Sequence, residues 1–466
     1  MKSLRGKMRL VGTLVVCLFL VLGVSYGFTV YSQGSVWASN PYNTRASGTT
    51  AHMGDITDRD GITLATTLSD GTRQYLENEQ ARRALSQTVG DQKGMSGTGV
   101  ENYYSATLLD ISGSLLDKLR AAFSGTERVG SSIQLTVDAQ LTTYLSSIFP
   151  EGYEGAICVI NYKTGEVLAM VSKPDYDPVA LLAGEEAQDT AYLNRCLQGL
   201  YTPGSTFKIV TLASAIENDP NVLNQKFTCS GSWNYEGGTI VCAGNAVHGT
   251  VDLKTAFAKS CNITFGKLAY QLGMERLRNT AELFGLNENF KFDDFMIYNS
   301  SFPKSGENLS DLVWSGVGQS QVLVTPMHMA MIAGAVANGG VMVEPKLVER
   351  IQNPLGITTH TRSVTTYRQV MSSSTAQTIA QAMYQAVTSG TATRAAISGH
   401  TVCGKTGSAE VSDDKSVPTH AWFVGFLAEE EHPYCVAVVV EHGGSGGLVA
   451  APIGQKALQK AIEVVG

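Results

Sequence analysis

Tyr201-Thr-Pro-Gly-Ser-Thr-Phe-Lys208 introduces an apolar stretch, residues 209–216, whose composition suits a helix. Proline and glycine are common just before a helix and disfavoured inside one, so they predict that the helix begins close to Ser205. Residues three apart share one face of a helix, which places Ser205 and Lys208 side by side. A desolvated lysine that loses its proton can act as the base for a serine hydroxyl, and N–H groups at a helix start suit a developing oxyanion. The stretch predicts a nucleophilic serine with its own base.

Ser-x-x-Lys is too short a pattern to identify an enzyme, so the prediction depends on two elements further along the chain. Ser260-Cys-Asn262 supplies a hydroxyl that can relay a proton and an amide that can bind a substrate backbone group. Lys405-Thr-Gly-Ser408 supplies a cation and two hydroxyls for a substrate carboxylate, and Gly407 lets the substrate approach the strand backbone. The three elements occur in the order that a serine acyltransferase needs.

Three other patterns are interpreted as structural. Lys163-Thr-Gly165 lies in an expected hairpin turn ahead of the serine, where the glycine serves turn geometry. Gly443-Gly-Ser-Gly-Gly447 matches a nucleophile elbow, but no histidine follows it, and an α/β-hydrolase needs one. Asp58-x-Asp60-Gly61 lacks the first and last ligands of an EF-hand loop, so it predicts a turn between two short strands. The sequence predicts no metal and no cofactor.

The N-terminus indicates the compartment. Four basic residues within the first nine positions precede an uncharged, largely apolar run from Leu10 to about Tyr31. This run is close to the ~20 residues that span a bilayer, and positive charge stays cytoplasmic. We expect an uncleaved anchor with the rest of the chain outside, with a signal peptide cleaved near Ala38 as the alternative. The net charge of −7 argues against a nucleic-acid partner.

Eight cysteines are too few for a dense disulfide framework in a chain of 466 residues. Cys229 and Cys242 bracket a loop that contains glycine and tryptophan, and a disulfide between them would contribute about 3 kcal/mol. A zinc site would need two further ligands, and only His248 lies nearby in the sequence. Whether Cys229 and Cys242 are bonded is left open.

The expected secondary structure predicts one sheet assembled from both ends of the domain that follows residue 130. A hairpin is expected at 156–162 and 166–172, after a helix that Asp138 caps. Three strands are expected near the end of the chain, at 403–411, 421–428 and 434–441. Helices are expected between and after these strands, at 252–265, 327–336, 372–387 and 453–465. This pattern indicates an α+β fold.

Taken together, the three elements resemble the active-site motifs of penicillin-binding proteins. Residues 55–61 and 97–101 are similar to the non-catalytic N-terminal part of class B members. The resemblance runs from about residue 54 to the end, and it includes Leu135-Thr-Val-Asp138, Asn194-Arg195, Gly318-Gln319, Ala337-Asn-Gly-Gly340 and Trp422-Phe-Val-Gly425. It implies a short, penicillin-binding protein A-like class B enzyme. The implied fold is that of serine β-lactamases and penicillin-binding transpeptidases, an antiparallel sheet of about five strands flanked by helices.

The resemblance also implies a domain organisation. The expected units are a cytoplasmic tail at 1–9, a transmembrane anchor at 10–31, a linker at 32–53, a non-catalytic α/β module at 54–130 and a transpeptidase domain at 131–466. The stretch between anchor and transpeptidase domain is too short for a glycosyltransferase domain. We therefore expect a membrane glycan polymerase as partner.

The activity implied is a D,D-transpeptidase that crosslinks peptidoglycan stem peptides and that β-lactams inhibit. Ser205 would attack the D-Ala-D-Ala carbonyl, Lys208 would take its proton, and Ser260 would pass a proton to the leaving D-Ala. The substrate-binding residues would be Asn262, Lys405, Thr406, Gly407 and Ser408, and the oxyanion hole would use the backbone N–H groups of Ser205 and Ser408. The alternatives are a D,D-carboxypeptidase or β-lactamase on the same fold, or a non-enzymatic β-lactam sensor or scaffold.

Overall fold

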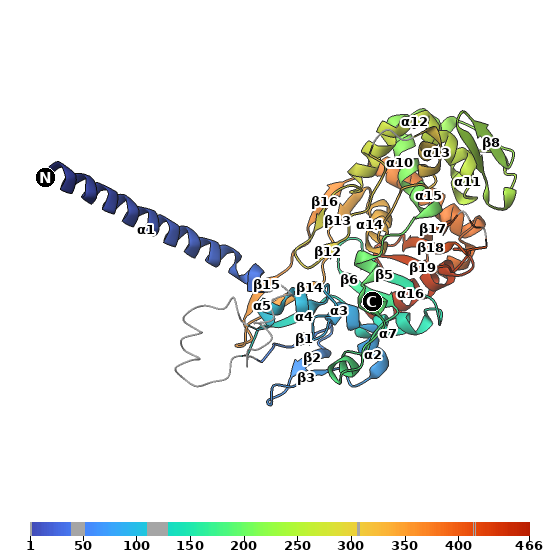
Figure 1. The fold of residues 1–466 in the computed structure, drawn as a ribbon. Helices are drawn as coiled ribbons and strands as arrows, with labels where there is room; N and C mark the ends of the chain where they lie inside the picture. Colours follow the sequence, from blue (N-terminus) through green and yellow to red (C-terminus); the bar gives the residue numbers. More distant parts are fainter. Residues whose placement is uncertain (1, 39–51, 110–128, 305–307, 413, 415) are drawn as a thin grey trace.

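A five-stranded antiparallel sheet joins the two ends of the transpeptidase domain predicted at 131–466 (Figure 1). The computed structural model describes residues 2–38, 52–109, 129–304, 308–412, 414 and 416–466. The strand order of the sheet is β17-β18-β19-β5-β6, and β19 pairs with β5. The strands are β5 (Gly155–Asn161), β6 (Val167–Lys173), β17 (Val402–Ala409), β18 (His420–Leu427) and β19 (Tyr434–Val440). The predicted single sheet is confirmed.

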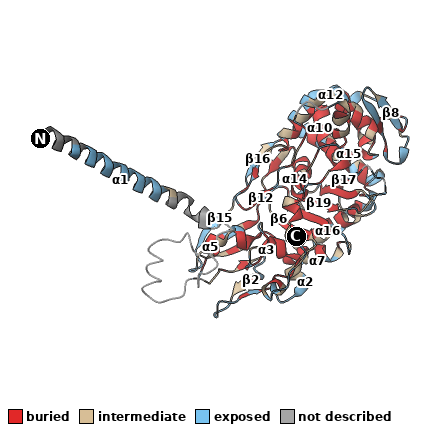
Figure 2. Ribbon diagram, viewed as in Figure 1, coloured by how far each residue is buried: buried red, intermediate tan, exposed pale blue. Residues whose placement is uncertain are grey.

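Helices cover both faces of this sheet, which explains why its strands are continuous apolar runs. α14 (Pro326–Ala337) packs on one face, and α7 (Ala139–Ile148) and α16 (Ala450–Val465) pack on the other. Alternate side chains of β5 enter the two cores: Cys158 and Ile160 lie on the α14 side, and Ile157 and Val159 lie on the α16 side. Figure 2 shows the sheet and α14 as buried.

A helical region beside β17 holds the serine stretch. α10 (Lys208–Asn218) packs against α12 (Asn262–Leu283), and α15 (Ser373–Ser389) packs against β17 and α11 (Leu253–Ala258). α13 (Leu309–Ser315) and two small two-stranded sheets border this region. One sheet pairs β7 (Phe227–Cys229) with β10 (Gly249–Val251), and the other pairs β8 (Ser232–Tyr235) with β9 (Gly238–Val241). The helices predicted at 327–336, 372–387 and 453–465 are confirmed.

A second sheet of six strands crosses the domain boundary predicted at residue 130. Its order is β15-β14-β4-β1-β2-β3, formed by β1 (Ile56–Thr57), β2 (Thr63–Thr67), β3 (Arg73–Tyr75), β4 (Ser132–Leu135), β14 (Val348–Gln352) and β15 (Thr358–Thr361). The three N-terminal strands are short, and a two-stranded hairpin is only marginally stable by itself. They gain a partner because β1 pairs in parallel with β4. The predicted division at residue 130 therefore does not separate two sheets.

Short elements complete the described chain. They are α2 (Glu79–Ala84), α3 (Ser86–Val89), α4 (Val100–Tyr103), α5 (Ser105–Leu108), α8 (Pro178–Leu182), α9 (Arg195–Gln198), β11 (Phe290–Lys291), β12 (Met296–Ile297), β13 (Val341–Val343) and β16 (Thr366–Gln369). Residues 110–128, which belong to the non-catalytic module predicted at 54–130, lie outside the described residues.

α1 (Lys2–Ala38) contains the apolar run in which a membrane anchor was predicted. Within it, Val11–Thr29 has a mean hydropathy of 2.2 over 19 residues, which is long and apolar enough to cross a bilayer. The apolar side chains of this span are exposed, as Figure 2 shows. The helix continues through Ala38 and so includes the first part of the stretch predicted as a linker, whose residues 39–51 lie outside the described part of the chain.

Candidate active site

Ser205 lies in a short 3₁₀ turn, Gly204–Phe207, that leads directly into α10. A 3₁₀ turn has three residues per turn, so Ser205 and Lys208 lie one above the other. The sequence predicted the same proximity, but from the spacing of residues on an α-helix. The α-helix itself begins only at Lys208. Gly204 has φ +54°, and a Cβ there would lie 3.2 Å from Cα of Ala409 in β17, so a side chain would separate the turn from the strand.

Backbone contacts fix the chain just before Ser205. The Tyr201 N–H donates to the Val324 carbonyl at 2.9 Å, and the Gly204 N–H donates to the Gly318 carbonyl at 2.8 Å. The indole N–H of Trp422, from β18, donates to the Thr202 carbonyl at 3.1 Å. These contacts tie the stretch to the sheet, so the serine is held on a supported turn.

Ser260 and Asn262 occupy a break between two helices, where the sequence had predicted mostly continuous helix over 252–265. α11 ends at Ala258 and α12 begins at Asn262. Ser260 has φ +57°, a left-handed conformation that is uncommon for serine and clusters at functional sites. Cys261 caps α12, because its sulfur accepts from the Thr264 N–H at 3.5 Å. The break turns Ser260 and Asn262 towards Lys208.

Lys208 is fully buried and makes three hydrogen bonds to this break. Its Nζ donates to the Ser260 carbonyl and to Asn262 Oδ1, each at 2.8 Å, and to Ser260 Oγ at 3.2 Å. The ammonium also lies 5.4 Å from the ring centre of Phe265. Burial lowers the pKa of Lys208 to about 7, because a charged amine loses its hydration there. The group is poised to exchange a proton near neutral pH.

Lys405 approaches the same hydroxyl from β17. Its Nζ donates to Ser260 Oγ at 3.0 Å and to the Thr406 carbonyl at 2.8 Å. Lys405 is also fully buried, and burial together with the positive charge of Lys208 lowers its pKa. Ser260 Oγ therefore accepts hydrogen bonds from two lysines. The positive charge of one lysine disfavours the charged form of the other.

The strand β17 supplies the other predicted binding groups. Thr406 Oγ1 lies 2.7 Å from Thr391 Oγ1, and Ser408 Oγ accepts from the Gly446 N–H at 3.1 Å. Gly407 has a role that the sequence did not suggest. A Cβ there would lie 2.8 Å from the Pro203 carbonyl oxygen, so the glycine lets β17 approach the serine turn itself.

These residues border one cleft of about 870 Å³. Ser205, Ser260, Asn262, Thr406 and Ser408 line it. Lys208 and Lys405 lie behind Ser260 and are fully buried. The structure therefore brings the eight predicted site residues together. Sequence reasoning missed several lining residues that lie in no predicted motif, among them Trp314, Thr391, Arg394 and Glu410.

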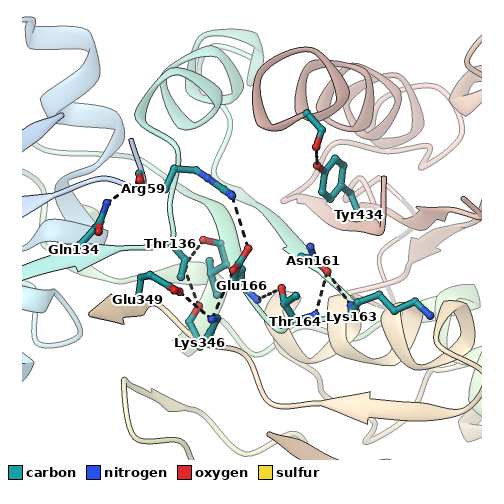
Figure 3. Close-up of polar contacts among 12 residues, drawn as sticks. Arg59, Gln134, Thr136, Asn161, Lys163, Thr164, Glu166, Lys346, Glu349 and Tyr434 are labelled. Atoms are coloured by element: carbon teal, nitrogen blue, oxygen red, sulfur yellow. Dashed lines mark hydrogen bonds and ion pairs between the residues drawn. The ribbon is translucent and has the colours of Figure 1, made fainter. Parts of the chain in front are cut away.

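Of the three patterns interpreted as structural, Asp58-x-Asp60-Gly61 forms the predicted turn between β1 and β2. The other two differ in their position relative to the cleft. Lys163-Thr-Gly165 forms the β5–β6 turn, where Asn161 Oδ1 accepts from the N–H groups of Lys163 at 2.9 Å and Thr164 at 3.1 Å. Figure 3 shows the Lys163 side chain extending away from the neighbouring labelled residues. Ser445, from the glycine-rich pattern, does line the cleft.

Cys229 and Cys242 meet at the cleft border as free thiols, with their sulfurs 3.6 Å apart. The structure does not join them in a disulfide. They lie instead beside two further residues, His248 and Cys261.

Comparison of the sequence with known proteins finds one family model and several relatives of the same class. The sequence model of the family described as the penicillin-binding protein transpeptidase domain matches residues 155–459. Peptidoglycan D,D-transpeptidase PbpA of Mycolicibacterium smegmatis is 30% identical over 437 residues, which cover 88% of this chain and 89% of that protein. Stage V sporulation protein D of Bacillus subtilis is 28% identical, covering 91% of this chain and 68% of that protein.

Solved structures show the same fold. A ceftriaxone acyl-enzyme complex of penicillin-binding protein A from M. tuberculosis superposes with a TM-score of 0.80 at 28% identity, covering 90% of this chain and 99% of that chain. The D,D-transpeptidase domain of a peptidoglycan glycosyltransferase from Eggerthella lenta superposes with a TM-score of 0.76 at 30% identity, covering 90% and 100%.

Proposed function

Because this chain belongs to the penicillin-binding protein transpeptidase family, as a class B member, we propose that Ser205 forms the acyl-enzyme through which it acts. The chain is a peptidoglycan D,D-transpeptidase that β-lactams inhibit. The assignment of Ser205 is supported above all by one observation: it lines the cleft one turn before a buried lysine whose pKa lies near 7. The other predicted residues take their proposed roles from their positions around it.

We propose that Lys208 is the base for Ser205. At neutral pH a large share of Lys208 is uncharged, so it can accept the serine proton as Oγ attacks the D-Ala-D-Ala carbonyl. Within the described chain, no hydrogen bond to Ser205 Oγ is present, and catalytic contacts commonly tighten only when substrate binds. The N–H groups of Ser205 and Ser408 are the proposed donors to the oxyanion.

Ser260 is the proposed relay to the leaving D-Ala, because its hydroxyl connects Lys208 and Lys405. A substrate carboxylate beside Thr406 and Ser408 would favour the charged form of Lys405. That charge would in turn favour the neutral form of Lys208, since two buried positive charges repel. Substrate binding would therefore prepare the base for the reaction.

The rate of acylation should depend on pH through Lys208. A neutral amine is required, so the acylation rate constant is expected to fall about tenfold per pH unit below pH ~7 and to level off above it. The measurement is stopped-flow acylation by a chromogenic cephalosporin from pH 5 to pH 9, with circular dichroism at each pH to confirm folding. A rate that is flat across this range would exclude Lys208 as the titrating base.

Crosslinking itself is tested with a short peptide ending in D-Ala-D-Ala and an added acceptor amine. Mass spectrometry should detect the peptide joined to the acceptor, with release of D-Ala. Hydrolysis that persists at high acceptor concentration, with no joined product, would instead identify a carboxypeptidase.

We also propose that α1 anchors the enzyme with its catalytic region outside the cytoplasm. The apolar span follows basic residues at Lys2, Arg5, Lys7 and Arg9, which supports this orientation. Residues 54–109 form only short strands and helices, which supports the absence of glycosyltransferase activity and a separate glycan polymerase as partner. Protease added outside spheroplasts should digest the catalytic region, and its survival intact would contradict this topology.

A further inference from the structure

Four side chains that bind zinc in other proteins converge at the border of the cleft. They are Cys229, Cys242, His248 and Cys261, and their candidate ligand atoms all lie within 4.8 Å of one another. Each comes from a different element. Cys229 ends β7, Cys242 follows β9, His248 precedes β10, and Cys261 caps α12. The three sulfurs are buried, and His248 is partly exposed.

Four of the six separations among these atoms are close to those of a tetrahedral metal site, and all six are within 4.8 Å. Sγ of Cys242 lies 3.6 Å from Sγ of Cys229 and 3.8 Å from Sγ of Cys261. Nδ1 of His248 lies 3.3 Å from Sγ of Cys229 and 3.7 Å from Sγ of Cys242. Tetrahedral zinc, with Zn–S about 2.3 Å and Zn–N about 2.0–2.1 Å, requires S···S separations of about 3.8 Å and S···N separations of about 3.6 Å.

Two buried cysteines outside the cluster, Cys196 and Cys435, have different surroundings, which argues against a coincidence of apolar packing. Cys196 donates to the carbonyls of Ile157 and Val171 at 3.4 and 3.3 Å. Cys435 likewise contacts two backbone carbonyls. In the cluster, the sulfurs contact one another and an imidazole, and Cys229 in addition lies 3.8 Å from the Ala246 carbonyl. Cys261 also accepts from both the N–H and the hydroxyl of Thr264, as a thiolate ligand would.

We propose that Cys229, Cys242, His248 and Cys261 bind one zinc ion. Three thiolates and one imidazole in tetrahedral array are a ligand set that zinc prefers, and four protein ligands leave no open position, as in structural sites. On binding, the three thiols lose their protons to solvent and form bonds to the metal, with no change in oxidation state. A single disulfide between Cys229 and Cys242 would leave Cys261 and His248 without this role.

The zinc would hold the active-site break in place. Cys261 stands between Ser260 and Asn262, the two residues that contact Lys208. Asn262 Nδ2 also donates to the Val241 carbonyl at 2.8 Å, next to Cys242. The four ligands are positioning residues, because they act on the cleft through Ser260 and Asn262. This effect on the reaction rests on the proposed function; the metal site itself does not.

The first test is the metal content of the full chain, purified in detergent without chelator or added reductant. We expect about one zinc per chain by inductively coupled plasma mass spectrometry, and full alkylation of Cys229, Cys242 and Cys261 after denaturation. Absence of zinc would overturn the proposal, whether the intact mass is two hydrogens lighter, as for a Cys229–Cys242 disulfide, or all thiols are free.

Variants then locate the metal. His248→Ala and Cys229→Ser should lower zinc affinity by about 100-fold or more in chelator competition. The matched controls His432→Ala and Cys435→Ala alter the same residue types away from the cluster and should keep the metal. Equal zinc affinity in His248→Ala, Cys229→Ser and wild type would overturn the assignment. If a ligand variant does not fold, the test uses visible absorption spectra of wild-type protein in which cobalt replaces zinc. Absorption bands of tetrahedral, thiolate-bound cobalt would support the site, and an octahedral spectrum would contradict it.

The positioning effect has its own readout. Removing zinc from the wild type is expected to slow penicillin acylation by about tenfold or more, and Zn²⁺ but not Mg²⁺ should restore the rate. An unchanged rate in zinc-free, folded protein would overturn the positioning role. The Ser205→Ala chain should hold the same zinc although it forms no adduct, so failure of the metal site and failure of the proposed nucleophile give different results.

Discussion

Ser205→Ala is expected to abolish covalent labelling by penicillin, with acylation slowed by at least about 10⁴-fold, because removing a serine nucleophile removes the bond-forming atom. The substitution should leave the fold intact. Ser205 is only partly buried and lines an open cleft, and the turn around it is held by the backbone of Tyr201 and Gly204 and by Trp422. Intact-mass spectrometry after incubation with penicillin measures the adduct, and thermal unfolding measures the fold.

Ser445→Ala is the matched control for this experiment. Ser445 lines the same cleft and lies in a pattern that resembles a nucleophile elbow, yet it is not proposed to react. The Ser445→Ala chain should still form the adduct, and peptide mapping should place it on Ser205. An adduct of normal yield on the Ser205→Ala chain would refute the assignment.

Glu101→Ala is expected to lower the free energy of unfolding by about 3–5 kcal/mol, because it leaves a buried arginine without its counter-ion. Arg73 Nε donates to Glu101 Oε1 at 2.6 Å, and each side chain is only 1% exposed. Tyr75 also donates its hydroxyl hydrogen to Glu101 at 2.7 Å. The carboxylate thus holds β3 to α4, and through it the N-terminal part of the six-stranded sheet.

Chemical denaturation measures this loss, and two variants calibrate it. Glu101→Gln keeps a hydrogen-bond acceptor for Arg73 and Tyr75 and should cost less. Arg83→Ala removes a more exposed pair, with Asp175, and should change stability by about 1 kcal/mol or less. If Glu101→Ala lowered the free energy of unfolding by as little as Arg83→Ala does, the buried Arg73–Glu101 pair would not stabilise the fold as proposed.

Much of the fold could be predicted because its signals are local. The apolar runs at 156–162 and 434–441 indicate buried strands without reference to their neighbours, and Asp138 caps α7 through its own side chain, accepting from the Leu141 N–H at 2.6 Å. Short motifs in a fixed order likewise predicted the residues that the structure brings together around Ser205. The six-stranded sheet spans the boundary predicted at residue 130, because β1 pairs with β4, and sequence patterning does not display that pairing.

By itself, the sequence determined that the chain carries a serine, two lysines and a serine–asparagine pair in the order of a penicillin-binding transpeptidase, on a sheet made from both ends of one region. The tertiary structure decided what those groups do to one another. Ser260 lies between Lys208 and Lys405 only because α10, the α11–α12 break and β17 pack together. Cys261 joins Cys229, Cys242 and His248 for the same reason. The charge and proton affinity of these side chains, and their ability to bind a metal, depend on the distances between them and on the exclusion of water. Packing of the helices and strands sets both.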